Sequence, residues 1–356
     1  MAEPSSNALH RLVCQMIKTQ GPLSVSDFMA TCLMHPDHGY YQKQVVFGEK
    51  GDFITAPEVS QMFGEMIGVY LINQWQKLGE PAHCHLVELG PGRGTLMADI
   101  LKTFALAPAL QQGISVHFVE TSQQLRALQK EKVQGATWHD DLSTLPDDAP
   151  ILLVANEFFD ALPIMQFQKH RRVWRERAVD MNEEHQLVWA LKHPNAGLHF
   201  LDKDFLSSAQ DGDIVEVCPQ AISITQTIAD MLRHQSGCAV IIDYGYAKTA
   251  FGDSLQALQG HQYVDPLQHL GEADLTAHVN FDSLATVFFD QGIATDPLYE
   301  QGQWLMGIGM GQRAEALAKG QSPDHQKAIL EALKRLTAPD QMGQLFKVLC
   351  AFHKSP

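Results

Sequence analysis

The stretch VELGPGRGTL (residues 87–96) places three glycines within five residues, directly after a short apolar run. This arrangement is typical of a tight strand-to-helix turn whose backbone approaches a ligand with no Cβ in the way. Gly90, Gly92 and Gly94, with Pro91 between the first two, read G-x-G-x-G. The dinucleotide pattern G-x-G-x-x-G is not met, and the missing G-K-[ST] excludes a P-loop. The turn therefore predicts a different adenosine-type ligand.

Acidic residues close each of the first three predicted strands. Glu88 stands two residues before Gly90, and Glu120 ends the second strand, where a carboxylate can accept hydrogen bonds from ribose hydroxyls. Asp140 and Asp141 end the third strand, within reach of an adenine ring. A carboxylate at Glu88 would repel a pyrophosphate, whereas S-adenosylmethionine carries an ammonium and a sulfonium. The pattern predicts an S-adenosylmethionine site; an ordinary turn with acidic helix N-caps is the alternative.

Apolar runs alternate with helical patterns from residue 83 onward, which predicts parallel strands in a doubly wound α/β sheet. Before this point the sequence is mostly helical, with one predicted helix over residues 60–77. The expected strands are residues 83–89, 114–120, 136–141, 150–158, 238–245 and 344–353.

The fourth and fifth strands are separated by about 80 residues, far more than an ordinary connection. Residues 165–181 and 185–192 alternate between apolar and polar side chains, which predicts a small antiparallel sheet. These patterns divide the chain into three predicted regions. Residues 1–80 are expected to form an N-terminal helical region with a lid loop. Residues 81–165 and 237–356 form the cofactor-binding core, and residues 166–236 an inserted α+β lobe for a substrate or partner.

The segment ANEFFDALP (residues 155–163) follows the fourth strand and supplies the candidate catalytic residues. Glu157 is the first choice, Asp160 the second, and Asn156 lies beside them. Carboxylates bind a guanidinium in a bidentate manner, and methyl transfer depends mainly on positioning in a dry site. The alternative is structural: Asp160 would cap a turn before Pro163, and Asn156 would bond to the backbone.

Further polar residues are predicted at the rim of the site. GDFITAPE (residues 51–58) supplies Asp52, Thr55 and Glu58 on a loop that contains Gly and Pro, typical of a lid or substrate wall. Alternatively, Glu58 stabilises the positive end of the next helix. Asp243 and Tyr244, at the end of the fifth strand, are expected to line the mouth of the substrate site.

The composition limits the classes of ligand. The net charge of −15, from 41 acidic and 26 basic residues, disfavours nucleic acid. Plain solubility is the favoured interpretation of this charge, and a basic partner is the alternative. The six cysteines include no C-x-x-C pair, which favours a reducing compartment and argues against a zinc framework. His35, His38, His269 and His278 match no strong ligand spacing, so no metal is expected.

The N-terminus predicts a domain helix. Leu9, Leu12, Val13, Met16 and Ile17 share one helical face, and the region shows neither a signal-peptide pattern nor the arginine content of a mitochondrial presequence. No apolar run reaches the length needed to span a membrane. We therefore expect a cytoplasmic protein without membrane insertion.

Several long motifs resemble the MidA-like S-adenosylmethionine-dependent methyltransferases. They are HPDHGYY, GDFITAPEVSQMFGE, ELGPGRGTLMADIL, NEFFDALPI, IIDYGY, GDSLQA, ADLTAHVNFDSLA and MGQLFKV. The resemblance implies a class I methyltransferase fold, with a seven-stranded sheet and an antiparallel C-terminal strand at 344–353. It also implies a cofactor site at Glu88, the three glycines, Glu120 and Asp140. Mitochondrial members of this family assemble respiratory complex I and methylate an arginine of one subunit.

The sequence thus predicts an S-adenosylmethionine-dependent methyltransferase that modifies an arginine side chain of a protein. A subunit of NADH dehydrogenase complex I is the candidate partner. Two alternatives stay open at this point: methylation of a small molecule, and a non-catalytic assembly chaperone built on a methyltransferase fold.

Overall fold

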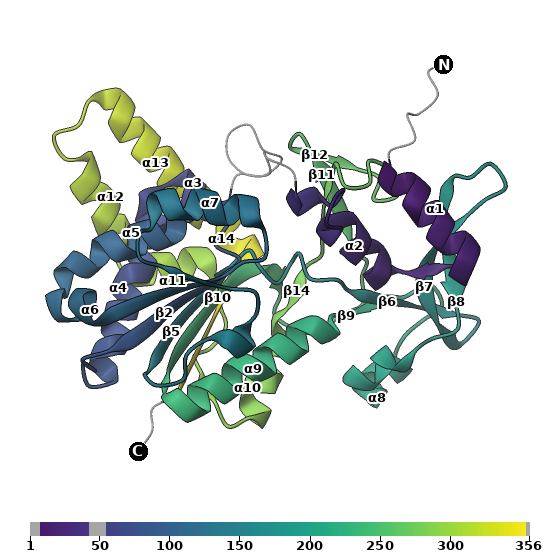
Figure 1. Ribbon diagram of the computed structural model, residues 1–356, viewed down its shortest axis with the longest axis horizontal. Helices are drawn as coiled ribbons and strands as arrows, with labels where there is room; N and C mark the ends of the chain where they lie inside the picture. The colour runs from purple at the N-terminus through teal and green to yellow at the C-terminus, as the bar shows by residue number, and fades with distance from the viewer. Residues whose placement is uncertain (1–7, 43–54, 354–356) are drawn as a thin grey trace. The chain divides into compact units, whose positions relative to one another are not determined.

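The computed structural model describes residues 8–42 and 55–353, and the chain divides into two compact units (Figure 1). Unit 1 comprises Met1–Phe53, Asp160–Ser223 and Thr249–His278, and unit 2 comprises Ile54–Phe159, Ile224–Lys248 and Val279–Pro356. Asp52 lies outside the described residues.

The central sheet of unit 2 has the strand order β15-β17-β10-β5-β2-β3-β4. Its strands are β2 (Cys84–Leu89), β3 (Ile114–Val119), β4 (Thr137–His139), β5 (Ile151–Asn156), β10 (Gly237–Tyr246), β15 (Ala294–Thr295) and β17 (Phe346–His353). Five neighbouring strands in this order are parallel: β10, β5, β2, β3 and β4. Strand β17 lies between β10 and β15 and is antiparallel to both. The predicted class I methyltransferase fold is confirmed. The seventh strand, β15, escaped the sequence analysis because two residues carry no alternation.

Two short strands, β14 (Val279–Asn280) and β16 (Tyr299–Glu300), extend β10 and β17. Helices cover both faces of the sheet: α4 and α5 lie on one face, α9 and α10 on the other (Figure 1). The helices of unit 2 are α3 (Ala56–Val59), α4 (Gln61–Lys77), α5 (Thr95–Thr103), α6 (Pro108–Gly113), α7 (Gln123–Lys132), α10 (Phe281–Asp290), α11 (Gln301–Gly307), α12 (Met310–Ala318), α13 (Pro323–Thr337) and α14 (Met342–Leu345); α9 (Pro219–Gln235) begins in unit 1.

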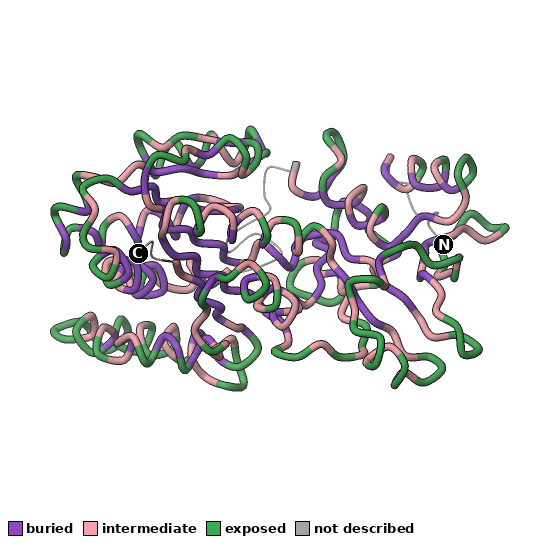
Figure 2. The backbone as a smooth tube through the Cα atoms, turned by 90° about the horizontal axis from the view of Figure 1, so that it is seen from below, coloured by how far each residue is buried: buried purple, intermediate pink, exposed green. Residues whose placement is uncertain are grey.

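Local sequence explains where the key helices begin. The Ser60 hydroxyl accepts a hydrogen bond from the Met62 amide (3.2 Å) at the start of α4, and Ser122 does the same for the Leu125 amide (3.4 Å) in α7. Both are N-caps that satisfy otherwise unpaired helix amides. All six residues of β2 and of β5 are buried, as expected for parallel strands covered on both faces (Figure 2).

Unit 1 contains the predicted antiparallel sheet. It has the order β1-β7-β6-β9, with β8 paired to β7, and a separate three-stranded sheet, β12-β11-β13. The strands are β1 (Leu23–Ser24), β6 (Met165–His170), β7 (Val173–Met181), β8 (Leu187–Lys192), β9 (Ile214–Val217), β11 (Gln256–Gln259), β12 (Gln262–Val264) and β13 (Asp274–Thr276). Its helices include α1 (Ala8–Gln20), α2 (Val25–Met34) and α8 (Lys203–Ser207).

The N-terminal helices belong with the inserted strands, not with the rest of residues 1–80. β1 pairs with β7, and the apolar faces of α1 and α2 share one core with β7 and with residues 257–277. The division therefore differs from the predicted boundaries, because α4 packs in unit 2 and residues 249–278 join unit 1. Single-sequence periodicity shows which face of a helix is apolar but not which surface covers it.

Phe28 in α2 tests this shared core. Its side chain is fully buried, so Phe28→Ala is expected to reduce the free energy of unfolding of unit 1 by about 3–5 kcal/mol. The measurement is urea denaturation with hydrogen exchange of residues 8–34. Phe289→Ala, at a site that is 80% exposed, is the control and should change stability by less than about 0.5 kcal/mol. Equal, small effects for both variants would contradict the packing described.

Candidate active site

The glycine turn joins β2 to α5 at the carboxyl edge of the sheet. Gly90, Gly92 and Gly94 all have left-handed backbones, with φ of 59°, 51° and 75°. The Gly94 amide donates to the carbonyl of Pro91 (2.7 Å), which closes the turn before Thr95 begins α5. Side chains other than glycine rarely adopt these angles, so the backbone geometry alone accounts for the spacing.

The three glycines differ in what surrounds them. A Cβ on Gly90 would lie 2.9 Å from the ring of Phe158, and one on Gly94 would lie 3.5 Å from the backbone of Gln129. A Cβ on Gly92 would meet nothing within 4 Å among the described residues. Gly92 is therefore the position where the backbone faces space that a ligand can fill.

Glu88 ends β2 beside this turn, and its side chain is only 3% exposed. Burial, with a smaller contribution from the nearby Glu120, raises the pKa of Glu88 to about 8, although a hydrogen bond from the Met97 backbone acts in the opposite direction. Within the part of the chain that is described, Oε2 has no hydrogen-bond partner. A buried carboxylate oxygen without a partner is costly. The ammonium and sulfonium of S-adenosylmethionine fit this position, because a cation would offset that cost.

Glu120 follows β3, and several hydrogen-bond donors hold its carboxylate. Its carboxylate accepts from the Ser122 amide (2.8 Å) and from Nε2 of Gln129 (3.3 Å). Burial raises the pKa of Glu120, and these hydrogen bonds partly offset the rise. Nε2 of Gln129 also donates to the carbonyl of Gly92 (2.8 Å), and its Oε1 accepts from the Trp138 indole (2.7 Å).

Gln129 is thus a positioning residue that sequence reasoning missed. It is fully buried and joins the glycine turn to the Glu120 carboxylate. Nothing local marks Gln129, since glutamine is common in helices. Only its position on α7, about two turns after the Ser122 cap, brings its side chain close to the ends of β2 and β3.

Asp140 and Asp141 lie in different environments from Glu88 and Glu120. The Asp140 side chain is 77% exposed and pairs with Arg126, whose guanidinium also donates to the carbonyls of Glu120 and His139. Asp141 caps the 3₁₀ helix Leu142–Thr144, and hydrogen bonds from Ser143 lower its pKa. Asp141 therefore occupies a helix N-cap, as the alternative interpretation described, whereas Asp140 caps no helix and pairs with Arg126.

Glu157, the predicted catalytic residue, follows β5 with an unusual backbone. Its φ is 49°, in the left-handed region that costs a non-glycine residue roughly 1–3 kcal/mol. Its amide donates to the carbonyl of Ile242 (2.9 Å), which extends the β5–β10 ladder by one residue. Its Oε1 accepts from the Ala56 amide and from Nδ2 of Asn156, both at 3.0 Å. Such strain clusters at functional sites.

Helix α3 connects this carboxylate with the glycine turn. Ala56, bonded to Glu157, begins α3, and Oε1 of Glu58 accepts from the hydroxyl of Thr95 (3.0 Å), the first residue of α5. Thr55 occupies the N-cap position but makes no capping side-chain hydrogen bond. Unit 2 therefore brings together Glu157, Glu58 and the turn, three motifs that are far apart in sequence.

Asp243 and Tyr244 were expected to line the mouth of the substrate site, but both side chains are buried. Asp243 is fully buried, and its carboxylate accepts from the amides of Phe159 (3.0 Å) and Tyr244 (2.9 Å). The Tyr244 ring is 2% exposed and packs edge-on against Phe346. Asp243 therefore fixes the backbone just after Glu157.

Asp160 begins the next segment of unit 1, with its side chain 7% exposed. Its carbonyl accepts from the Ala277 amide (3.0 Å), which ties the segment after β5 to residues 249–278.

Comparison with known proteins assigns the chain to a class. A family described as S-adenosyl-L-methionine-dependent methyltransferase matches residues 66–297, more than half of the chain. Two crystal structures from Burkholderia thailandensis share the fold. One, bound to S-adenosyl-homocysteine, has a TM-score of 0.85 and 24% identity over 99% of this chain and 95% of its own. The other has a TM-score of 0.84 and 26% identity over 99% and 94%.

The chain belongs to this family of S-adenosyl-L-methionine-dependent methyltransferases. Its cofactor is S-adenosylmethionine, as predicted. More particularly, it is similar to proteins named "Protein arginine methyltransferase NDUFAF7, mitochondrial". The Mus musculus relative is 38% identical over 93% of this chain and 81% of its own length. The Xenopus laevis relative is 35% identical over 96% and 84%, and the Homo sapiens relative 34% over 97% and 84%.

These names correct one prediction. A cytoplasmic location was expected, whereas the relatives are named as mitochondrial proteins, so that prediction is contradicted. Among the described residues, none of the helices is long and apolar enough to cross a membrane.

Gly92→Val should abolish measurable S-adenosylmethionine binding, because a branched side chain would fill the open space at the turn and strain its left-handed backbone. Isothermal calorimetry measures the affinity. Gly135→Val is a matched control: Gly135 also has a positive φ (77°) and no atom within 4 Å of its Cβ position, but it lies before β4, away from the turn. Unchanged affinity in a folded Gly92→Val protein would exclude the turn as the cofactor site.

Glu88 makes cofactor affinity depend on pH. In the free protein its carboxyl is neutral below about pH 8. A cationic ligand favours the ionised form, so binding at lower pH must release the proton, and affinity should rise by up to about tenfold per pH unit until pH 8. For the same reason the free protein should lose stability as pH rises from about 4.5 to 8, where the folded state alone retains this proton.

The measurement is S-adenosylmethionine affinity by calorimetry at pH 6, 7 and 8, compared between the native chain and Glu88→Gln. Titration of the ligand itself is common to both proteins, so the difference isolates Glu88. Parallel pH profiles for the two proteins would show that Glu88 does not face the cationic groups.

Proposed function

We propose that this methyltransferase transfers the methyl group of S-adenosylmethionine to the side chain of an arginine in a protein. The observation that carries the proposal is the similarity to relatives named protein arginine methyltransferases, which extends over most of both chains. An acceptor of this kind is cationic, so its site needs carboxylates at the place where the methyl group is transferred.

Glu157 has the properties expected of such a carboxylate. It is located at the carboxyl end of β5, next to the β2 end that holds the glycine turn. Two donors, the Ala56 amide and Asn156, fix its orientation. Oδ1 of Asn156 has no partner within the part of the chain that the structure describes, and a substrate N–H can satisfy it. Asp160 is the second candidate carboxylate.

The chemistry balances without a further reactant. The lone pair of one guanidinium nitrogen attacks the methyl carbon, the bond from that carbon to sulfur breaks, and the cofactor leaves as S-adenosylhomocysteine. The nitrogen then loses one proton, which the Glu157 carboxylate can accept. A carboxylate in this role also binds the planar guanidinium through two hydrogen bonds, which aligns the reacting nitrogen.

The inserted lobe is the proposed contact surface for the protein substrate. Four of its large apolar side chains are at least 36% exposed: Val173, Val188, Leu191 and Phe200. Exposed apolar surface is what a protein partner can bury on association. As the specific partner we propose a subunit of respiratory complex I, which the resemblance to the MidA-like family supports.

The test is mass spectrometry of complex I subunits from cells that lack the gene and are complemented with either the native chain or Glu157→Gln. We expect an arginine methyl mark only with the native chain. In vitro, Glu157→Gln should reduce methyl transfer by about two to three decades, or ~3–4 kcal/mol, with unchanged cofactor affinity. The substitution retains one oxygen that can accept from Ala56, and it replaces the other, charged oxygen by a neutral NH2 group.

Near-native turnover by Glu157→Gln would remove this residue from the mechanism and leave Asp160 and Glu58 as candidates. If complex I carried the same marks with and without the gene, the partner would be another protein or a small molecule. A native level of complex I assembly with Glu157→Gln would instead support a non-catalytic chaperone.

A further inference from the structure

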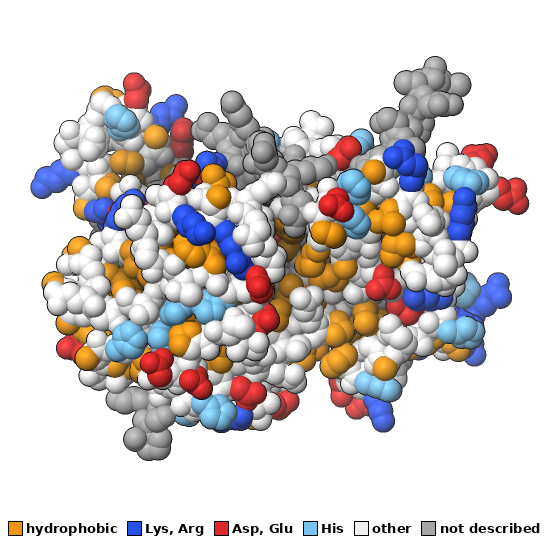
Figure 3. All heavy atoms as spheres, in the orientation of Figure 1, with side chains coloured by type: hydrophobic (Ala, Val, Ile, Leu, Met, Phe, Trp, Pro, Cys, Tyr) orange, Lys and Arg blue, Asp and Glu red, His pale blue; other side chains and the backbone are white. Residues whose placement is uncertain are grey.

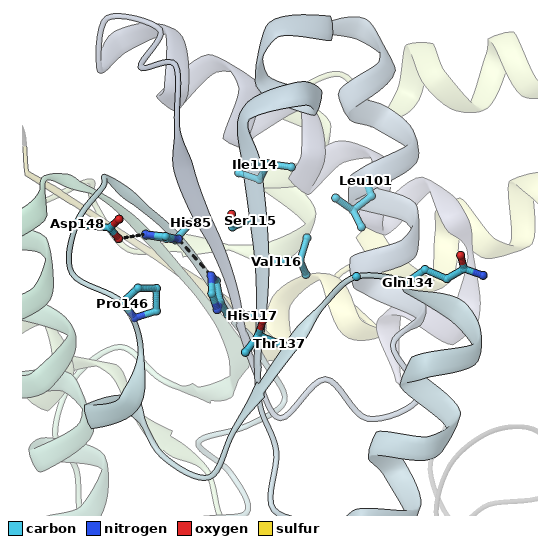
Figure 4. A pocket seen from close by; sticks show the side chains of 11 residues that line it. His85, Leu101, Ile114, Ser115, Val116, His117, Gln134, Thr137, Pro146 and Asp148 are labelled. Atoms are coloured by element: carbon cyan, nitrogen blue, oxygen red, sulfur yellow. Dashed lines mark hydrogen bonds and ion pairs between the residues drawn. The ribbon is translucent and has the colours of Figure 1, made fainter.

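A row of histidines crosses the sheet diagonally, from the amino end of β2 to the carboxyl end of β4. Nδ1 of His85 in β2 lies 3.1 Å from Nε2 of His117 in β3, and Nδ1 of His117 lies 3.0 Å from Nε2 of His139 in β4. Asp148 closes one end, with Oδ1 at 2.9 Å from Nε2 of His85, and the Thr144 hydroxyl closes the other, 2.9 Å from His139. Figure 4 shows Asp148, His85 and His117 in line, and Figure 3 shows histidines gathered over this part of the sheet.

A fourth histidine lies at the acidic end of the row. The ring of His83 packs edge-on against that of His85, with centroids 5.1 Å apart. Its Nδ1 lies 2.9 Å from the carbonyl of Gly113. A carbonyl only accepts, so Nδ1 carries the proton and the lone pair of the neutral ring lies on Nε2. This is the arrangement found in metal-binding histidines, whose second nitrogen donates to a backbone carbonyl.

His85 can adopt the same tautomer, with the proton on Nδ1 and the lone pair on Nε2. When Nδ1–H of His85 donates to His117, and that of His117 to His139, the lone pair of His85 lies on Nε2 and faces the carboxylate of Asp148. Two electron-rich groups at 2.9 Å need a proton or a cation between them. The row of buried rings can therefore hold His85 in the tautomer that binds a cation.

We propose that His83, His85 and Asp148 bind a divalent cation of the zinc type, with His117 and His139 as the outer hydrogen-bonded shell that orients His85. One ring nitrogen of each histidine and one oxygen of Asp148 all lie within 4.8 Å of one another. Two imidazoles and a carboxylate form a typical three-residue zinc set, with ligand bonds of about 2.0–2.2 Å. His85 is buried, whereas His83 and Asp148 are exposed and can close around the ion.

The site is separate from the cofactor turn. A pocket of about 520 Å³, lined by His85, His117 and Asp148 among others, opens at the amino ends of β2, β3 and β4, where Ile114 and Thr137 begin their strands. The glycine turn is at the opposite, carboxyl ends. The pocket leaves room for a water molecule or small anion as the fourth ligand of the ion. Bound there, the cation would link the entry to β2 with the segment before β5.

The test is titration of the metal-free, full-length protein with Zn²⁺ alone, in competition with a chromophoric chelator under reducing conditions. We expect one site with a dissociation constant below about 1 µM. His83→Ala and Asp148→Asn, both at exposed positions where folding should be retained, should each weaken it by about 100-fold. His117→Phe should weaken it by about 10–100-fold, as loss of an outer-shell partner does.

His269→Ala is the matched control. His269 and Glu272 form an exposed pair (3.9 Å), so its removal should leave Zn²⁺ affinity unchanged. Bound Co²⁺ should show the intense visible bands of tetrahedral coordination without a thiolate charge-transfer band, and S-adenosylmethionine affinity should persist in His83→Ala. Absence of one-to-one Zn²⁺ binding, equal affinity in His83→Ala and the native chain, or a thiolate band would each overturn the proposal.

Discussion

A carboxylate buried at the end of the first parallel strand, with one oxygen lacking a partner among the described residues, is the feature on which the rest of the site depends. Glu88 is ionised only at a cost in the free protein, and a cation beside the glycine turn removes that cost. The surrounding structure keeps this position ready. The left-handed glycines let the backbone approach a ligand closely. Gln129 donates both to the carbonyl of Gly92 in the turn and to the Glu120 carboxylate. We infer that affinity for a cationic cofactor arises from charges and dipoles already arranged in the free protein, which limits rearrangement upon binding.

The second half of the site is built on backbone hydrogen bonds around Glu157. Asp243, buried in β10, accepts from the Phe159 amide, and the Glu157 amide continues the sheet ladder. The Glu157 carboxylate also accepts from the Ala56 amide at the start of α3, and Glu58 of that helix accepts from Thr95 at the start of α5. Glu157 has a strained backbone, and hydrogen bonds hold both its amide and its carboxylate. Such a residue is well suited to hold a substrate nitrogen at one fixed distance from the methyl group. His83, His85 and Asp148 lie at the opposite, amino ends of the strands, so one scaffold presents two chemically different groups of side chains.

Much of the fold could be predicted because its signals are local. The strand that carries Glu88, the strands that end just before Glu120 and Asp140, and the helices that begin after Ser60 and Ser122 all follow from apolar runs, caps and glycines. Two features could not be predicted from local pattern. β15 has two residues and exists only because β17 pairs with it, and the N-terminal helices could not be assigned to the inserted strands before their apolar faces were seen to share one core. The cytoplasmic location inferred from the N-terminal residues was contradicted by the mitochondrial names of the relatives.

By itself, the sequence determined the class of chemistry. Three glycines in a strand-to-helix turn and acids at successive strand ends depend on residues that are neighbours along the chain, so backbone sterics and charge are enough to interpret them. Only the tertiary structure decided which side chains act together. It showed that Asp140 is exposed and that Asp141 caps a helix, whereas Glu88 and Glu120 are buried. It brought the side chain of Gln129 into hydrogen-bond contact with the glycine turn. It also brought His83 and His85 next to Asp148, more than sixty residues away. Burial and long-range contact set these pKa values and partners, and both arise only when distant strands pair.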